Sequence, residues 1–178
     1  YNGLIKKVQD ICVGDYIMGD DSTSRKVLSL ARGREQMYRI SSAISEPYVV
    51  NKSHILSFKV YKGTRFIKCV DLSIEDYLYM KEMLRRSPVK MLGYKTAVQF
   101  VKKPVPIDPY EFGARSSSMS MTEIPYVYKC NSIEIRLAFL AGLLENSKRV
   151  NHGQSIIYKG TVVIADVLYV ARSVGLLA

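Results

Sequence analysis

The chain has only two histidines, and one of them, His54, lies in a stretch that could perform acid–base chemistry. Residues 48–58 read YVVNKSHILSF, so Asn51 precedes His54 by three positions. An imidazole has an ordinary pKa of about 6.5, and a well-placed one can raise a rate by roughly 10² to 10⁴ through proton transfer. On this pattern alone, a lone and partly buried histidine on a strand is the simpler interpretation.

The cysteines and the second histidine, His152, give no indication of a metal site. Cys12, Cys69 and Cys130 are far apart, odd in number and without a C-x-x-C pair. Structural zinc sites and disulfide frameworks need paired or closely spaced ligands. We therefore expect three buried, inert thiols and no bound metal at these residues.

The chain is strongly basic. It has 26 Lys and Arg residues against 16 Asp and Glu, a formal charge of +10, which favours a polyanionic partner such as DNA through counterion release. A solvated basic surface is the alternative. No apolar run approaches the roughly 20 residues that span a bilayer, and no cleavable signal appears, so we expect an intracellular protein without a membrane partner.

The first half of the chain has the pattern of short strands. From residue 4 to about residue 70, alternating apolar and polar runs are separated by turn residues, which indicates a meandering all-β unit. The predicted strand regions are LIKKV, DYIMGDDSTSRKVLSLARG, QMYRISS, PYVVNKSHILSFKV and RFIKCVD. Within the second of them, GDDS is a tight-turn signal.

At Ser73 the apolar spacing changes to that of a helix. Ser73 is the expected N-cap, with Glu75 and Asp76 in the first turn, and Pro88 is expected to end the helix. Three further segments are predicted: a strand at residues 95–101, a Pro-rich connector at 102–113 and a small, polar loop at 114–123.

The last third of the chain predicts two helices with a short strand, SIIYK, between them. Asn131, followed by Glu134, is expected to cap the first helix. The second is expected at residues 161–174, with Gly175 as its stop. The apolar stripes are Ile133, Leu137, Leu140 and Leu144 on the first helix, and Val163, Val167, Val170 and Val174 on the second.

Two stretches of the first half resemble inteins, the self-splicing proteins whose Hint fold is shared with hedgehog autoprocessing domains. Residues 8–40, VQDICVGDYIMGDDSTSRKVLSLARGREQMYRI, are similar to the early part of an intein. Residues 48–58 are similar to the later motif, a strand carrying T-x-x-H, and the order and spacing of the two stretches fit. The resemblance implies a Hint fold and autocatalytic protein splicing.

The same resemblance assigns roles to two residues. In the family, an N-terminal Cys or Ser attacks the carbonyl before it, and the T-x-x-H histidine hydrogen-bonds the scissile amide and protonates the leaving nitrogen. His54 is the residue that matches this role. Asn51 stands where the family has Thr, and its amide can still donate and accept an orienting hydrogen bond.

The family pattern extends beyond both ends of the sequence. The resemblance begins about a dozen residues inside the family's start, so the nucleophilic Cys or Ser is not among these residues. The closing strands and the terminal His-Asn, whose asparagine cyclises to release the intein, are not among them either. The 178 residues are therefore not expected to splice by themselves. Three interpretations stay open: a fragment, an ordered subset of a longer chain, or one half of a split arrangement.

The stretch LAFLAGLLENSK, residues 137–148, resembles the LAGLIDADG helix of the homing endonucleases that many inteins carry. In the matching register Gly142 lies where two such helices pack closely. Ser147 replaces the carboxylate that holds Mg²⁺ in the family, and Glu145, two residues earlier, leaves the helix in a different direction. Because Mg²⁺ needs anionic oxygen ligands, the resemblance implies a degenerate motif that does not cut DNA.

Two other stretches extend this resemblance. PVPIDPYEFG, residues 104–113, is similar to the entry to the first LAGLIDADG copy, and residues 161–177 are similar to the helix that closes the second repeat. Lys148 and Arg149 are candidate DNA contacts, with a solvated helix end as the alternative. A coincidental leucine-rich core helix is the alternative for the whole stretch.

The predicted fold is a mainly β Hint-type (hedgehog/intein) domain followed by a reduced α+β region similar to LAGLIDADG endonucleases. Its expected parts are the N-terminal part of the Hint domain at residues 1–72, a helix–strand connection at 73–103 and a nuclease remnant at 104–178. Between the entry to the first LAGLIDADG copy and the second copy, residues 114–130 are too few for the family's DNA-reading sheet, so we expect that sheet to be missing.

The predicted activity is autocatalytic splicing of the chain's own flanking extein segments, without a cofactor, beside an inactive homing endonuclease. The element would lie inside the cell, wherever its host protein lies. Two alternatives stay open. One is a site-specific DNA endonuclease within a longer chain, which would need Mg²⁺, and the other is a DNA-binding remnant without catalysis.

Overall fold

The computed structural model describes residues 1–41, 47–116, 121, 123–145, 148–150, 155–157 and 164–176, with the backbone alone described for 148–150 and 155–157. The chain forms two compact units, residues 31–95 and residues 1–30 with 96–178. Each unit has its own hydrophobic core. None of the described helices is both long and apolar enough to cross a bilayer.

The unit of residues 31–95 contains two antiparallel sheets and one helix. Strands β3 and β4 pair with each other, and β5 is the centre of a sheet with the order β6-β5-β7. The three strand regions predicted here all contain strands, but residues 52–54 divide the second region in two, and the strand at residues 89–93 was not predicted. The elements are β3 Met37–Ile40, β4 Tyr48–Asn51, β5 Ile55–Lys62, β6 Arg65–Ser73, α1 Ile74–Met83 and β7 Val89–Gly93.

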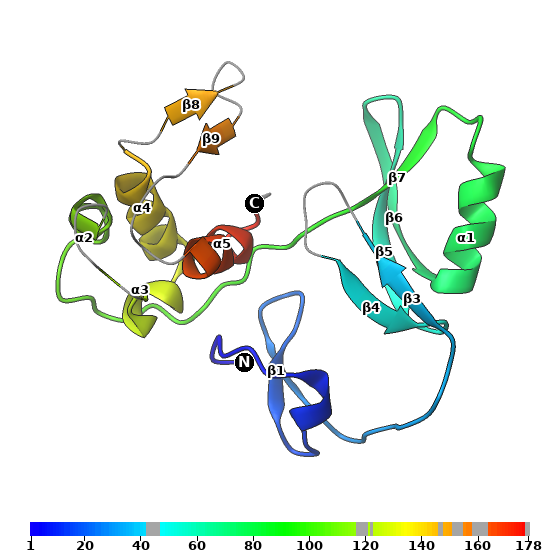
Figure 1. Ribbon diagram of the computed structural model, residues 1–178, viewed down its shortest axis with the longest axis horizontal. Coiled ribbons are helices and arrows are strands. Elements are labelled where there is room, and N and C mark those ends of the chain that lie inside the picture. Colours follow the sequence, from blue (N-terminus) through cyan, green and yellow to red (C-terminus); the bar gives the residue numbers. More distant parts are fainter. Residues whose placement is uncertain are drawn as a thin grey trace. The chain divides into compact units, whose positions relative to one another are not determined.

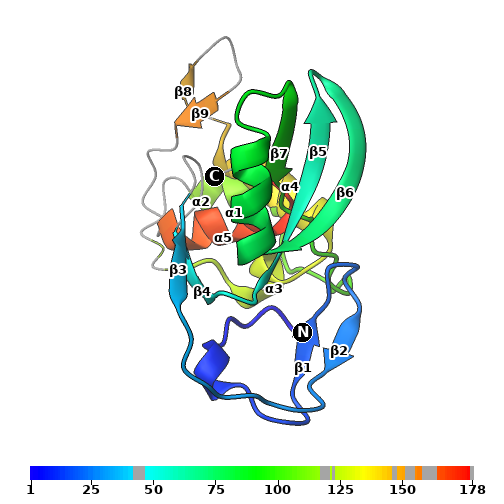
Figure 2. The same cartoon turned by 90° about the vertical axis from the view of Figure 1, so that its right-hand side faces the viewer.

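The core of this unit lies between the β6-β5-β7 sheet and α1, which packs on the sheet (Figure 2). Leu56 and Phe58 alternate along β5 toward Ile74, which is 1% exposed, and the ring of Phe58 stacks on Tyr77 with centroids 4.8 Å apart. Ser73 caps α1 as predicted, because its Oγ accepts a hydrogen bond from the backbone N–H of Asp76 at 3.1 Å.

The hairpin of residues 1–30 belongs to the other unit. Its strands are β1, Tyr16–Met18, and β2, Ser24–Lys26, and a short 3-10 helix, Val8–Asp10, precedes them. The predicted turn at GDDS is confirmed. The predicted strand at LIKKV is wrong, because residues 4–8 form no strand and Leu4, Ile5 and Val8 are at least 69% exposed.

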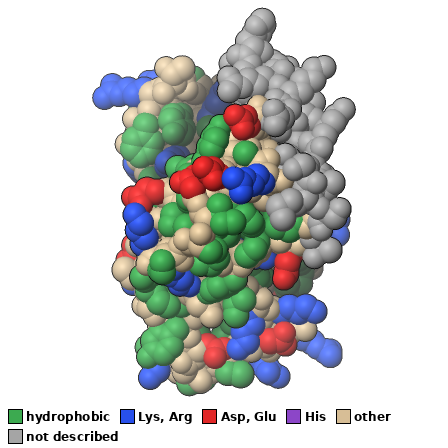
Figure 3. Space-filling view, turned by 90° about the vertical axis from the view of Figure 1, so that its left-hand side faces the viewer, with side chains coloured by type: hydrophobic (Ala, Val, Ile, Leu, Met, Phe, Trp, Pro, Cys, Tyr) green, Lys and Arg blue, Asp and Glu red, His purple; other side chains and the backbone are tan. Residues whose placement is uncertain are grey.

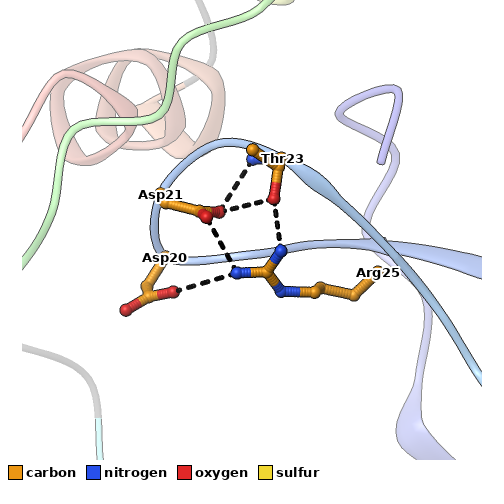
Figure 4. Close-up of polar contacts among 4 residues, drawn as sticks. All are labelled: Asp20, Asp21, Thr23 and Arg25. Carbon is orange, nitrogen blue, oxygen red and sulfur yellow. Dashed lines mark hydrogen bonds and ion pairs between the residues drawn. The ribbon is translucent and has the colours of Figure 1, made fainter.

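The side chain of Asp21 holds the hairpin turn together (Figure 4). One of its carboxylate oxygens accepts from the backbone N–H of Thr23 at 3.0 Å and from the Thr23 hydroxyl at 2.7 Å, and the other accepts from Arg25 at 2.8 Å. These hydrogen bonds, those of Thr23 first, lower the pKa of Asp21 from 3.8 to about 2. The turn is therefore stabilised by an ionised carboxylate.

The helices in the unit of residues 1–30 and 96–178 pack around one core (Figure 1). Phe139 and Val170 are fully buried at its centre, and the rings of Phe112 and Tyr128 stack with centroids 4.2 Å apart. The predicted short strand at SIIYK is confirmed in part. The elements are α2 Pro109–Ser116, α3 Tyr126–Lys129, α4 Ile133–Leu143, β8 Lys148–Val150, β9 Ser155–Ile157 and α5 Ile164–Ser173.

The strand predicted at residues 95–101 is wrong, and the connector predicted at 102–113 is wrong in its second half. Residues 94–105 form no strand, because their backbone groups bond elsewhere: the N–H of Val98 donates to Ser173 at 2.8 Å. α2 begins at Pro109, where Asp108 accepts from the backbone N–H of Tyr110 at 3.0 Å. An Asp-Pro pair is a helix start, which outweighs the prolines before it.

The predicted cap and stripe of the first late helix are also corrected. Ser132 is the N-cap of α4, while the Asn131 side chain bonds the backbone of Lys103 and Val127. Leu137, predicted to be buried, is 43% exposed. The buried residues of α4 face α2 on one side and α5 on the other, and they are Ile135, Arg136, Phe139, Leu140, Gly142 and Leu143.

The helix predicted at residues 161–174 is confirmed in the part that the structure describes, where it is α5. Val167 and Val170 of α5 are buried, and Gly175 follows with a positive φ of +83°. Residues 161–163, including Val163, lie outside the described residues. The expectation of three buried thiols is wrong, because Cys12 and Cys69 are exposed and Cys130 alone of the three is buried.

Candidate active site

His54 lies in a tight turn between two strands. β4 ends at Asn51 and β5 begins at Ile55, and the backbone N–H of His54 donates to the carbonyl of Asn51 at 3.2 Å. The imidazole is exposed. The alternative interpretation, a partly buried histidine on a strand, is therefore wrong, because the chain turns at residues 52 and 53 and the ladder starts only after His54.

A carboxylate outside the motif fixes this turn. The Asn51 amide donates to Glu35 at 2.9 Å and to the Ser53 hydroxyl at 2.9 Å, and that hydroxyl donates to the same Glu35 oxygen at 3.3 Å. Glu35 reaches the turn because Met37 on β3 pairs with Asn51 on β4. We name these four residues, Glu35, Asn51, Ser53 and His54, the His54 turn.

An ion pair holds the other side of the same turn. The Lys52 ammonium lies 3.1 Å from a carboxylate oxygen of Glu75, in the first turn of α1. The hydrogen bond to Glu75 raises the pKa of Lys52 above its usual range. Both groups are about half exposed or more, so this pair contributes little stability by itself. Its effect is to tie the turn to the helix that caps the sheet.

The arrangement suits proton transfer to a group that arrives from solution. The strand that follows His54 carries Leu56 and Phe58 into the core, so the backbone beneath the imidazole is fixed while its ring is exposed. An exposed imidazole can take up a proton from water and donate it to a leaving nitrogen. Asn51 is bound to Glu35 and Ser53, so it positions the turn.

Sequence reasoning missed Glu35. The residue stands in RGREQMYRI, a stretch that carried the resemblance to inteins without a role in the site. Its contact with Asn51 spans 16 positions and depends on the register of β3 with β4. A carboxylate just before a strand that pairs with the N-x-x-H strand is the signal that would have found it.

The LAGLIDADG-like stretch lies where α2 and α4 cross. A methyl group added at Gly113 would lie 2.8 Å from the backbone nitrogen of Leu143, and one added at Gly142 would lie 2.8 Å from that of Ala114. The methyl group at position 113 would also collide with the carbonyl oxygen of Phe139, and the one at position 142 with the carbonyl oxygen of Tyr110. The two helices therefore meet backbone to backbone, through one glycine each.

The acidic and basic candidates of this stretch differ in how far the structure describes them. Glu145 lies just beyond α4, and its carboxylate accepts a hydrogen bond from the Tyr110 hydroxyl, which raises the pKa of Tyr110 above the usual value of 10. Ser147 lies outside the described residues, and Lys148 and Arg149 belong to β8, of which the backbone alone is described. Among the described residues, no three Asp, Glu, His or Cys side chains cluster as a metal site would require.

The described surface shows mixed charge on the face in Figure 3. There, acidic and basic side chains are interspersed around hydrophobic ones, and this view contains no continuous basic surface. Two of the surface cations pair with acids close to them in the sequence: Arg115 with Glu111 on α2 at 3.4 Å, and Arg85, just after α1, with Glu82 at 3.4 Å. The net charge of +10 is therefore not concentrated on the face that Figure 3 shows.

Comparison with known families agrees with the resemblance in the first half of the chain. A family model described as Hom_end-associated Hint matches residues 1–83. The match covers the early hairpin, the His54 turn and α1, and it supports an intein-type Hint domain in a context of protein splicing and homing endonucleases. No curated protein shows significant similarity to the chain.

Proposed function

We propose that this chain is part of an intein and that its Hint region takes part in autocatalytic protein splicing. The observation that carries the proposal is the combination of the family match at residues 1–83 with the histidine turn inside it. The substrate is the peptide bond between the intein and its own flanking segment. No cofactor is required, and the element functions wherever its host protein resides.

In the proposed reaction, the first residue of the intein, a Cys or Ser, attacks the carbonyl carbon of the flanking residue. The nucleophile loses its proton as a thioester or ester bond forms, the peptide C–N bond breaks, and the nitrogen leaves as an amine that gains a proton. His54 donates a hydrogen bond to that nitrogen and supplies the proton. Asn51, Ser53 and Glu35 hold the turn that carries His54.

The first test replaces His54 in the full precursor with its flanking segments. His54→Gln is expected to slow N-terminal cleavage by roughly 10² to 10⁴, because the proton donor is lost. Precursor and products are followed by gel electrophoresis and mass spectrometry. Lys68→Gln, at an exposed position of β6 in the same unit, serves as the polar control.

The fold itself gives a second measurement for the same variant. Since His54 is exposed, His54→Gln should change the free energy of unfolding by less than about 0.5 kcal/mol. Splicing at the native rate by a folded His54→Gln precursor would contradict the assigned role. A native precursor that forms no spliced product in any flanking context would contradict splicing itself.

We also propose that the α2–α4 pair is a remnant of a LAGLIDADG homing endonuclease that no longer cuts DNA. The close approach through Gly113 and Gly142 supports this, because nuclease helices of that family pack through this motif. Ser118 and Ser147 each stand five residues after one of these glycines, where the metal-binding acids belong. Neutral hydroxyls hold Mg²⁺ far less well than carboxylates.

Incubation of the full precursor with plasmid libraries and Mg²⁺ tests this proposal. No site-specific cleavage is expected, and restoring both acids, Ser118→Asp with Ser147→Asp, is the variant most able to regain it. Specific cleavage by the native protein would instead support the alternative of an active endonuclease in a longer chain.

A DNA-binding remnant without catalysis is the second alternative, and the charge of +10 favours it. Binding to duplex DNA would weaken steeply as salt rises, with a slope set by the number of phosphates neutralised. Lys148→Ala with Arg149→Ala should reduce that slope if these residues touch phosphate. Lys52→Ala, whose ammonium is paired with Glu75, is the control.

A further inference from the structure

The segment at the beginning of the sequence is bound by side chains of the helical region. The Tyr126 hydroxyl donates to the carbonyl of Asn2 at 2.5 Å, and the Tyr169 hydroxyl donates to the carbonyl of Gly3 at 2.7 Å. Two phenols, from α3 and α5, thus hold two consecutive carbonyls. These bonds span more than a hundred positions, so local chain geometry does not explain them.

The buried thiol of Cys130 lies beside both the segment and Tyr169. Cys130 is 1% exposed, and its sulfur lies 3.5 Å from the Tyr169 hydroxyl. A side chain at position 3 would collide with this sulfur and would come within 3.1 Å of the Phe100 ring. Gly3 also has a positive φ of +97°, so glycine is required there for both space and backbone conformation.

The buried guanidinium of Arg136 makes this region rigid. It is fully buried and donates to the carbonyls of Asn131, at 2.9 Å, and Ser173, at 2.8 Å, and also to that of Val98. It lies 4.8 Å from the centre of the Phe100 ring. Arg136 therefore connects the start of α4, the end of α5 and the segment before α2 behind the bound residues.

A second attachment involves the turn of the early hairpin. The backbone N–H of Gln99 donates to the Ser22 hydroxyl at 2.8 Å, and Ser22 itself has a positive φ of 65°. Residues 1–30 consequently belong to the same compact unit as residues 96–178. The family match at residues 1–83 thus begins in one unit and ends in the other.

We infer that Tyr126, Cys130 and Tyr169 form a seat for residues 2 and 3, and that through this seat the helical region positions the early Hint segment for splicing. This inference rests on the proposed function. It gives the helices a role that needs no DNA and no metal. The three residues are positioning residues, since they contact the chain that leads to the reacting bond and not the bond itself.

Thiol labelling under native conditions tests the seat without any assay of splicing. In the native chain an alkylating reagent should modify the exposed Cys12 and Cys69 quickly and Cys130 slowly. Gly3→Ala should speed the modification of Cys130 by at least about tenfold, because the added methyl forces the segment off the thiol. Cys12 and Cys69 are internal controls, read by peptide mass spectrometry.

The matched control is Gly14→Ala. Gly14 has a nearly equal φ of +93°, but nothing lies within 4 Å of a methyl group added there. It therefore introduces the same backbone strain without the collision, and Cys130 should stay protected. Tyr169→Phe should raise the labelling of Cys130 less than Gly3→Ala does, and Tyr79→Phe, at a site 68% exposed, should leave it unchanged.

The positioning role is then read in the full precursor. Gly3→Ala should slow N-terminal cleavage by roughly 10-fold to 100-fold, as a displaced reacting group does. Adding Cys130→Ala to this variant should restore part of the rate, because the sulfur that the methyl meets is removed. Recovery of the rate would show that the contact between position 3 and the sulfur, and not the backbone conformation of Gly3 alone, governs cleavage.

The outcomes separate this inference from the proposed function. Equally fast labelling of all three cysteines in the native chain would overturn the seat. A protected Cys130 that Gly3→Ala exposes, with cleavage at the native rate, would overturn the positioning role while leaving splicing intact. A native precursor that does not splice would overturn the proposed function, and with it the positioning role, even if the labelling shows that the seat exists.

Discussion

The His54 turn and the α2–α4 crossing hold their residues in place in opposite ways. The turn is exposed and polar, and Glu35 fixes it by hydrogen bonds of 2.9 and 3.3 Å. The crossing is dry, with Phe139 and Leu143 at most 2% exposed. An exposed turn can lose a side chain while the fold survives, whereas a crossing of two backbones cannot accept an added one.

This difference separates two kinds of information. Substitutions in the turn report on chemistry, because they leave the core untouched. Substitutions in the crossing report on stability, because interiors are packed as densely as organic crystals and cannot absorb a new methyl group without moving. A residue whose change affects activity and stability equally would break the comparison.

The largest expected effect is on the crossing. Gly142→Ala places a methyl group against the backbone of Tyr110 and Ala114, so the helices must move apart. We expect the free energy of unfolding to fall by about 3 kcal/mol, measured by urea denaturation. Gly33→Ala is the control, because nothing lies within 4 Å of its added methyl. A loss no larger than that of the control would show that the helices do not cross this closely.

Short-range signals predicted much of the fold. The cap at Ser73 and the turn at Asp21 depend on neighbours within a few positions, and both are found as predicted. The alternating pattern of β5 likewise needs only its own residues, since every second side chain turns inward. Such features are set before any distant segment is in place.

Long-range contacts explain the errors. Residues 95–101 have a strand-like composition, but Val98 bonds Ser173 and Arg136, which belong to helices. The α4 stripe was wrong because a buried arginine, Arg136, does not look apolar in the sequence. For the candidate site, the sequence proposed Asn51 and His54, which the structure places in one turn, and it could not show the contact of Glu35 because only the pairing of β3 with β4 brings that carboxylate to the turn.

A smaller effect is expected at Glu35, and it concerns activity. Glu35→Ala removes the carboxylate that accepts from both the Asn51 amide and the Ser53 hydroxyl, so the turn that carries His54 loosens. N-terminal cleavage should slow roughly tenfold, while the free energy of unfolding should change by less than about 1 kcal/mol, since the groups are exposed. Glu82→Ala, on α1, is the control, and Glu35→Gln should retain part of the rate because its amide oxygen still accepts. A stability loss as large as that of Gly142→Ala would remove the distinction between the two regions.

The smallest expected effect is in a third region, the polar turn at Asp21 in the β1–β2 hairpin. The pKa of Asp21 is about 2 in the folded chain against an ordinary 3.8, so its carboxylate stabilises the fold above about pH 4. This contribution is lost as the pH falls through about 2, where the folded-state carboxyl takes up its proton.

Asp21→Asn should therefore lower the unfolding midpoint at neutral pH, and the difference from the native chain should shrink steadily between pH 4 and pH 2. Asp20→Asn, at an 88% exposed side chain whose ion pair with Arg25 is 4.0 Å long, should show almost none of this pH dependence. An Asp21 carboxyl that titrates near its ordinary pKa by NMR would show that the turn in Figure 4 is not held by its charge.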